Sequence, residues 1–281
     1  MQYHHITPQQ IAEFGRYLRS EERSAGTIEN YLRHIRAFSA WLNGNPASRE
    51  AAGEWRDHLL SRGYSPATVN AMLVPLNRFF DFQGWRECRS KSLRLQRRLF
   101  REDSRELTRT EYDRLISAAL SLGRERLALL MESICATGIR VSEVQYLTVE
   151  NARRGQAEVS LKGKIRVILI PGKLRRKLLS YAKKKKIGSG EIFLTRTGRG
   201  MSRKQIWAEM KLVCQKAGVA ASKVFPHNLR HLFARTFYQV SRDVAKLADV
   251  LGHSSIETTR IYLISTGAEH ARQLERMCLV E

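Results

Sequence analysis

Apolar residues recur every three to four positions along most of this chain, and one short stretch departs from that spacing. The helical spacing runs through the first 85 residues and returns in several segments after residue 107. Residues 158–170 instead alternate between apolar and polar side chains, as a half-buried strand does. We therefore predict a mainly α protein with one small sheet.

The first 85 residues carry the signals of four helices. Pro8 follows the cap residue Thr7 at the start of the first apolar stripe, and Asn43-Gly44 ends the second. The third stripe ends near Gly63, and Ser65-Pro66 begins the fourth. We predict a compact four-helix domain over residues 1–85.

Two regions follow this domain. Residues 86–106 lose the apolar stripes and contain seven arginines, which is typical of an inter-domain connection. Such a connection is either a solvated linker or a segment that touches phosphates. Residues 107–281 combine helical stripes with the alternating stretch, so we predict a mixed α+β domain with a small antiparallel sheet.

The alternating stretch predicts a β-hairpin with a basic turn. Residues 162–164, Lys-Gly-Lys, stand in its middle, where the chain should reverse. The apolar residues on either side share one parity: Val159, Leu161, Ile165, Val167 and Leu169.

The charge of the chain indicates its class of partner. The formal net charge is +22, and after residue 106 there are 32 Lys and Arg against 15 Asp and Glu. Such a field favours a polyanion, so we predict that nucleic acid binds mainly to the C-terminal part. No apolar run approaches the roughly 18 residues of a membrane span, and residues 1–7 lack a secretion signal. We expect a cytoplasmic protein without a membrane partner.

The four cysteines, Cys88, Cys135, Cys214 and Cys278, lie far apart and form no CxxC pair. This spacing argues against a zinc knuckle and against a disulfide framework. We expect free thiols and no metal.

Three motifs in the second domain carry residues suited to chemistry on a phosphate. They are ATGIRVSE at residues 136–143, PHNLR at 226–230 and LGHSSIETTRIY at 251–262. With the basic hairpin turn they resemble the tyrosine recombinase (phage integrase) family. In that family an arginine after Thr-Gly, a hairpin lysine, a His-x-x-Arg, a Leu-Gly-His and a tyrosine occur in this order. The resemblance covers residues 107–281 as a catalytic domain, and residues 1–85 resemble the family's core-binding domain.

The resemblance implies roles for these residues at a scissile DNA phosphate. Arg140 and Arg230 would bind its non-bridging oxygens, which planar guanidinium groups do bidentately. His227 lies three residues before Arg230, so on a helix beginning at Pro226 the two share a face. We assign His227 to acid and base assistance. His231, one turn further on, is expected to take no part.

Further residues would complete the site by the same resemblance. Glu143, at i+3 from Arg140, would orient that arginine, with a plain surface ion pair as the alternative. His253 would hydrogen-bond the phosphate. A hairpin lysine would protonate the leaving 5′ oxygen; we assign Lys162, with Lys164 as the alternative general acid.

Tyr262 would make the attack. A phenol is a poor nucleophile at neutral pH, but arginines at the phosphate and a nearby base make the phenolate accessible. The resulting 3′-phosphotyrosyl bond stores the energy for religation, so no cofactor, ATP or metal would be needed. Tyr262 is one of nine tyrosines, and its assignment depends on the motif around it.

The resemblance also implies an assembly and a biological role. A homo-tetramer would join two double-stranded DNA sites through a Holliday junction, with a tail helix at residues 268–279 packing on a neighbouring protomer or on its own domain. The reaction would integrate or excise a mobile element, or resolve chromosome dimers as Xer-like enzymes do. A type IB topoisomerase-like enzyme and a non-catalytic DNA-binding protein are the remaining alternatives.

Overall fold

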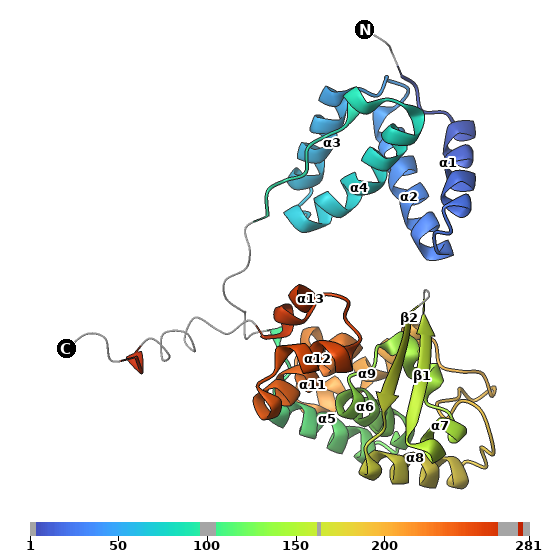
Figure 1. Ribbon diagram of the computed structural model, residues 1–281, viewed down its shortest axis with the longest axis vertical. Coiled ribbons are helices and arrows are strands. Elements are labelled where there is room, and N and C mark those ends of the chain that lie inside the picture. Colours follow the sequence, from blue (N-terminus) through green and yellow to red (C-terminus); the bar gives the residue numbers. More distant parts are fainter. Residues whose placement is uncertain (1–3, 96–104, 162–163, 264–274, 278–281) are drawn as a thin grey trace. The chain divides into compact units, whose positions relative to one another are not determined.

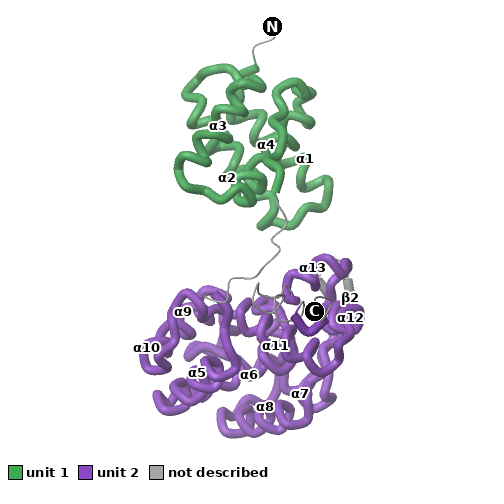
Figure 2. The backbone as a smooth tube through the Cα atoms, turned by 90° about the vertical axis from the view of Figure 1, so that its left-hand side faces the viewer, with its two compact units in different colours: residues 1–97 green, residues 98–281 purple. Residues whose placement is uncertain are grey.

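The computed structural model describes residues 4–95, 105–161, 164–263 and 275–277. The chain divides into two compact units, residues 1–97 and 98–281, which are coloured separately in Figure 2. The division falls within the arginine-rich segment 86–106. Each unit has a hydrophobic core of its own, as independent domains do.

Four α-helices build the first unit, which confirms the predicted helices (Figure 1). They are α1 Pro8–Ser20, α2 Ala25–Leu42, α3 Arg49–Ser61 and α4 Pro66–Gln83, followed by the short 3-10 helix η1 Arg86–Cys88. Each α-helix begins after a Ser or Thr whose side chain accepts a hydrogen bond from a backbone N–H of the first turn. These caps explain why the helix starts could be predicted from the sequence.

Aromatic side chains fill the core of the first unit. Phe14 of α1 meets Phe79 of α4 edge to face, with ring centroids 5.5 Å apart. Phe38 of α2 meets Phe80 of α4 in the same way at 6.1 Å. All four rings are fully buried, and burying a ring of this size stabilises a fold by about 2 kcal/mol. Helix α4 therefore holds α1 and α2 together.

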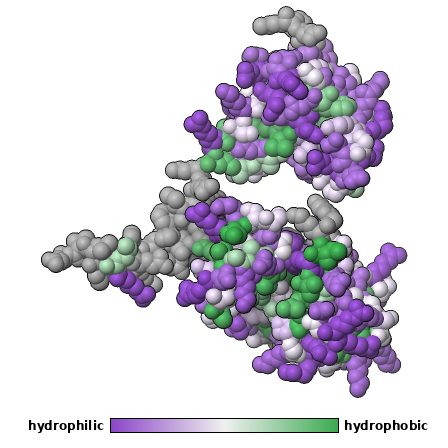
Figure 3. Space-filling model, viewed as in Figure 1, coloured by the Kyte–Doolittle hydropathy of each residue, from purple (hydrophilic) through white to green (hydrophobic). Residues whose placement is uncertain are grey.

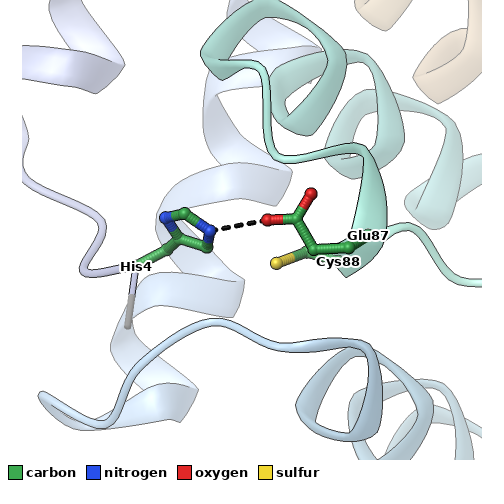
Figure 4. A group of neighbouring side chains, drawn as sticks. All are labelled: His4, Glu87 and Cys88. Atoms are coloured by element: carbon green, nitrogen blue, oxygen red, sulfur yellow. Dashed lines mark hydrogen bonds and ion pairs between the residues drawn. The ribbon is translucent and has the colours of Figure 1, made fainter. Parts of the chain in front are cut away.

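The start of the chain is fastened to the end of this unit (Figure 4). The imidazole Nε2 of His4 lies 2.7 Å from a carboxylate oxygen of Glu87. The His4 ring also stacks on Trp85, with ring centroids 4.5 Å apart. The Cys88 thiol donates to the carbonyl of Ala47. Nitrogen, oxygen and sulfur ligand atoms of His4, Glu87 and Cys88 thus lie within 4.8 Å of one another, but each already has a protein partner. We interpret the group as a hydrogen-bonded clasp.

The second unit is mainly helical with one two-stranded antiparallel sheet, as predicted (Figure 1). Its elements are α5 Arg109–Ser121, α6 Glu125–Thr137, η3 Val141–Tyr146, α7 Val149–Arg154, β1 Gln156–Leu161, β2 Lys164–Leu169, α8 Gly172–Lys184, α9 Arg203–Leu212, α10 Cys214–Ala217, η4 Ala221–Lys223, α11 Pro226–Ser241, α12 Val244–Leu251, α13 Ile256–Arg260 and η5 Ile261–Leu263. None of the helices in the described part of the chain is long and apolar enough to cross a bilayer.

The hairpin places its apolar residues on two faces, although they share one parity in the sequence. Val159 pairs with Arg166 and Ser160 with Ile165, because two residues connect the strands and each odd position on β1 meets an even one on β2. Val159 is 1% exposed, whereas Ile165 and Leu169 are 74% and 69% exposed. Figure 3 shows hydrophobic side chains at the surface over this sheet. Only one face of the hairpin packs on the core.

Helix α6 runs through the middle of the second unit and ends at the motif glycine. Eight of its 13 residues are buried, as in a helix that packs on all sides. Gly138 then adopts the left-handed conformation with φ +63°. A Cβ at this position would lie 2.4 Å from the ring of Phe233 in α11. The glycine thus permits α6 to end directly against α11.

Candidate active site

The motif residues lie at the ends of three α-helices and in one 3-10 helix of the second unit. Arg140 follows α6, His227 and Arg230 lie in the first turns of α11, His253 follows α12, and Tyr262 lies in η5. Their side chains are joined by hydrogen bonds and ring contacts. The tertiary fold therefore brings segments from distant parts of the sequence to one place.

The start of α11 is held from two sides. Pro226 occupies its first turn after the extended residue Phe225. The buried amide of Asn228 donates to the carbonyl of Lys223 at 2.7 Å and to that of Arg105 at 2.9 Å. These bonds fix the turn from which His227 and Arg230 project.

Arg230 is buried against the ends of two helices. Its guanidinium donates to the carbonyl of Gly138, after α6, and at 2.8 Å to that of Leu251, in the last turn of α12. Helix C-termini carry partial negative charge, which compensates a buried cation. Burial lowers the pKa of Arg230, and a hydrogen bond with Tyr262 opposes that shift. The guanidinium is thus bonded to the ends of two helices and interacts with Tyr262.

Arg140 is the more accessible arginine, with 40% of its side chain exposed. Its Nη1 donates to Glu143 at 2.8 Å, and its backbone N–H donates to the other oxygen of that carboxylate, also at 2.8 Å. The Glu143 side chain is 1% exposed and also binds Arg166 at 2.6 Å. Glu143 is therefore a buried carboxylate shared by two arginines, and the interpretation as a plain surface ion pair is wrong.

Both ring nitrogens of His253 have partners. The guanidinium of Arg230 lies 3.0 Å from Nε2, and the hydroxyl of Thr259 lies 2.8 Å from Nδ1. Because a guanidinium can only donate, Nε2 accepts and Nδ1 carries the proton. Thr259 is fully buried and so orients the imidazole, a role that was not expected from the sequence.

Three imidazole rings surround the phenol of Tyr262, which is 5% exposed. The ring of His253 stacks on it at 5.6 Å, and those of His227 and His231 lie at 5.8 and 4.5 Å. The Arg230 guanidinium also interacts with this side chain. The phenol is therefore enclosed by proton-accepting rings and by one cation.

His231 was expected to take no part, yet its ring is the nearest of the three to Tyr262. Its Nδ1 lies 3.4 Å from a carboxylate oxygen of Glu106, which also binds Arg235 at 2.8 Å. His231 and His227 are one helical turn apart and lie on one face of α11. That spacing was the only sequence signal for its place in the site.

The two motif histidines are neutral at neutral pH. Burial, followed by the charge of His231 and Arg230, lowers the pKa of His227 to about 4. Burial, followed by Arg230 and Arg140, lowers the pKa of His253 to about 4. A neutral imidazole can accept a proton from a phenol, and the adjacent cations attract an anionic group.

The hairpin lysines are the least defined part of the site. Lys162 lies outside the described residues, and Lys164 is described only as the first residue of β2, paired with Leu161. The predicted tail helix at 268–279 also lies outside the described residues, apart from 275–277. These assignments remain predictions.

Comparison with known proteins identifies relatives along both units. Residues 105–269 match the phage integrase family, and residues 11–87 match the phage integrase N-terminal SAM-like domain. A tyrosine recombinase XerA of Thermococcus kodakarensis is 31% identical, with 96% of each chain covered.

Solved structures with the same fold share less sequence. A Tn1549 transposon integrase bound to transposon right end DNA superposes with a TM-score of 0.73 at 17% identity, covering 97% of this chain and 99% of that one. A lambda integrase tetramer bound to a Holliday junction gives 0.74 at 18% identity, covering 90% and 76%. These likenesses concern the fold.

Proposed function

Because this chain belongs to the phage integrase family and is a tyrosine-type site-specific DNA recombinase, we propose that Tyr262 is its nucleophile. The phenolate attacks a DNA phosphate in line, releases a 5′ hydroxyl and leaves a 3′-phosphotyrosyl bond. The observation that carries this proposal is the enclosure of the Tyr262 phenol by three imidazoles and the Arg230 guanidinium. An ordinary core tyrosine has no need of such surroundings.

The arginines bind the non-bridging oxygens of the phosphate. The accessible guanidinium of Arg140 makes the first contact, and Arg230 stabilises the charge that develops in the transition state. Arg230 is 1% exposed, so the side chains around it must rearrange before a phosphate can reach it. Glu143 keeps the Arg140 fork in place.

The histidines handle the proton of the nucleophile. His227 accepts it as a general base, which its lowered pKa permits. His253 stacks on the phenol ring, and it donates a hydrogen bond to the phosphate once Arg230 has turned from its Nε2 to the phosphate and that nitrogen carries a proton. Lys162, or alternatively Lys164, protonates the leaving 5′ oxygen from the hairpin.

The partner is double-stranded DNA, which the charge of +22 favours. We propose that residues 1–85 form the core-binding domain and residues 107–281 the catalytic domain, with residues 86–106 between them on the DNA. Four protomers form a homo-tetramer around two DNA sites, joined through the C-terminal tail helix. Since its substrate is DNA of the cell, the enzyme works in the cytoplasm, without a cofactor.

Two biological roles fit this activity. Integration or excision of a mobile element is the first. Chromosome dimer resolution, as in Xer-like enzymes, is the alternative, and the similarity to enzymes named tyrosine recombinase XerA, XerC and XerD is the reason to retain it. Sites found at the two ends of an inserted element would support the first role, and one site in the chromosome would support the second.

The test begins by capturing the DNA that the protein attacks. The protein is incubated in EDTA with sheared DNA of its source organism, and DNA that stays linked to protein in detergent is sequenced. A nicked duplex of the captured sequence then serves as the substrate for a denaturing gel. We expect a protein-linked band with the wild type and none with Tyr262→Phe. A band that survives in Tyr262→Phe would show that another residue is the nucleophile.

A further inference from the structure

We infer that Arg166 is a positioning residue that anchors the lysine-bearing hairpin to the catalytic centre. The inference rests on the proposed function, because it assigns Arg166 to the step in which a hairpin lysine protonates the leaving group. Arg166 lies on β2, two positions after Lys164 and four after Lys162. It therefore lies near the turn, so its contacts can influence the position of the lysine.

The guanidinium of Arg166 connects three elements. Its Nη2 lies 2.6 Å from the Glu143 carboxylate of η3. Its Nη1 donates to the carbonyls of Val250, at 3.3 Å, and Leu251, both in the last turn of α12. One side chain of the hairpin is thus bonded to the segment after α6 and to the segment that leads into His253.

The same acceptors hold the two arginines that we assign to the phosphate. Glu143 also accepts from Arg140 at 2.8 Å, and the Leu251 carbonyl also accepts from Arg230 at 2.8 Å. Arg166 is therefore tied to the groups that set the positions of both. Its side chain is 12% exposed, against 40% for Arg140, so it is placed to hold protein rather than DNA.

The backbone around Arg166 makes room for it. Gly252 has a φ of +64°, and a Cβ at this position would lie 2.3 Å from the Cδ of Arg166. Burial lowers the pKa of Arg166 to about 10, while the Glu143 charge opposes the shift. The guanidinium consequently stays charged at neutral pH and remains an ion-pair partner of Glu143.

The hairpin needs such an anchor near its turn, because little apolar packing holds that end. A two-stranded hairpin is only marginally stable by itself in water. In the pair next to Arg166 toward the turn, Ile165 is 74% exposed and Ser160 is also exposed. Among the pairs whose side chains the structure describes, Val159 and Arg166 form the first, counted from the turn, that packs inward. Without the bonds of Arg166, the described part of β2 next to the turn would lose its attachment to Glu143 and to the end of α12.

A sulfur-substituted substrate tests this role. In DNA with a 5′-bridging phosphorothiolate at the cleavage point, the leaving group is a thiolate, which departs without protonation because thiols are far more acidic than alcohols. Loss of the general acid therefore slows cleavage of ordinary DNA and leaves sulfur DNA almost unaffected. The captured sequence, prepared as a nicked duplex in both forms, is the probe.

We expect Arg166→Met to cleave ordinary DNA about 100-fold more slowly, as a displacement of about 1 Å does in an active site. On DNA with the phosphorothiolate, the cleavage rate of this variant should be within a few-fold of the wild-type rate. Arg166→Lys keeps the charge but loses the fork that bridges Glu143 and Leu251, so it should show the same selective defect. If Arg166→Met does not fold, Arg166→Lys alone tests the role of Arg166.

Three controls separate the possible results. Arg153→Met, at an exposed position in α7, should cleave both substrates like the wild type. Arg140→Ala should be slow on both, because it acts on the phosphate. Of Lys162→Ala and Lys164→Ala, the variant that removes the general acid should cleave ordinary DNA slowly and phosphorothiolate DNA at nearly the wild-type rate. That result identifies the general acid.

The outcomes distinguish the inference from the proposed function. If the wild type forms no protein-linked band with either substrate, the proposed function is wrong. If the wild type cleaves and a lysine variant is rescued, but Arg166→Met and Arg166→Lys are equally slow on both substrates, then only the role of Arg166 is wrong. Full activity of both Arg166 variants on ordinary DNA would also overturn it.

Discussion

The imidazole of His253 lies nearly parallel to the phenol of Tyr262, with 5.6 Å between the ring centroids and 14° between the planes. The imidazole cannot turn freely, because Arg230 and Thr259 occupy its two nitrogens. The stacked ring therefore positions the phenol relative to Arg230. It follows that changes at His253 should act on the nucleophile as well as on the phosphate.

Replacing His253 by alanine should lower the rate of covalent complex formation by about 100-fold, the usual cost of losing a positioned donor at a phosphate or oxyanion. Thr259→Val removes only the hydrogen-bond partner of Nδ1, so it should lower this rate by less. The rate of appearance of the protein-linked band measures both. Equal losses in the two variants would mean that orientation of the ring, rather than its bond to the phosphate, is the main contribution.

Stability should fall as the pH is lowered from about 6.5, the ordinary pKa of histidine, to about 4, the pKa of His227 and His253 in the fold. In this window the unfolded chain binds more protons than the folded one, so protons favour unfolding. Above it both states are neutral at these residues and their contribution is constant. Thermal unfolding at a series of pH values should show a shallower slope for the double variant His227→Gln and His253→Gln. An unchanged slope would contradict the lowered pKa values.

Two substitutions at His231 test whether DNA cleavage depends on its aromatic ring or on its ring nitrogens. His231→Phe keeps an aromatic ring against Tyr262 but loses the interaction with Glu106, whereas His231→Ala loses both. If the ring only packs the nucleophile, the phenylalanine variant should cleave within a few-fold of the wild type and the alanine variant about 10-fold more slowly, a cost of ~1.4 kcal/mol. A phenylalanine variant as inactive as Tyr262→Phe would instead show that His231 carries the proton.

Gly138→Ala should destabilise the second unit by about 2–4 kcal/mol, which combines a left-handed conformation with overpacking against Phe233. Gly123→Ala is the matched control, since Gly123 has a φ of +67° and no atom within 4 Å of an added Cβ. Its cost should be about 1 kcal/mol. Urea unfolding of both variants gives the comparison. Equal losses of unfolding free energy in the two variants would show that α11 shifts to accommodate the added methyl group.

Much of the fold could be predicted because its signals are local. The hydroxyl of Thr7 caps α1 within one turn, and the prolines at positions 8, 66 and 226 have the backbone angle of a helix start. After Gly138 the chain does not continue as an α-helix but forms the 3-10 helix η3. There the side chain of Glu143 bonds to the backbone of Arg140, which ties the segment to the active site.

Residue parity was not sufficient for the hairpin. Val159 and Ile165 are both odd-numbered, yet one is buried and the other is exposed. The face of β2 depends on the number of residues in the connection, and a change of one residue would exchange the two faces. Lys162, in that connection, is for the same reason the least determined residue of the proposed site.

The sequence by itself determined the family, the helical architecture and the identities of Arg140, His227, Arg230, His253 and Tyr262 as candidates, because these follow from local periodicity and from motif order. Only the tertiary structure placed other side chains in the site. His231 meets Tyr262, Thr259 orients His253, and Arg166 joins β2 to Glu143 and α12. Ring stacking and buried ion pairs join residues far apart in the chain, and whether such residues meet depends on how the helices pack.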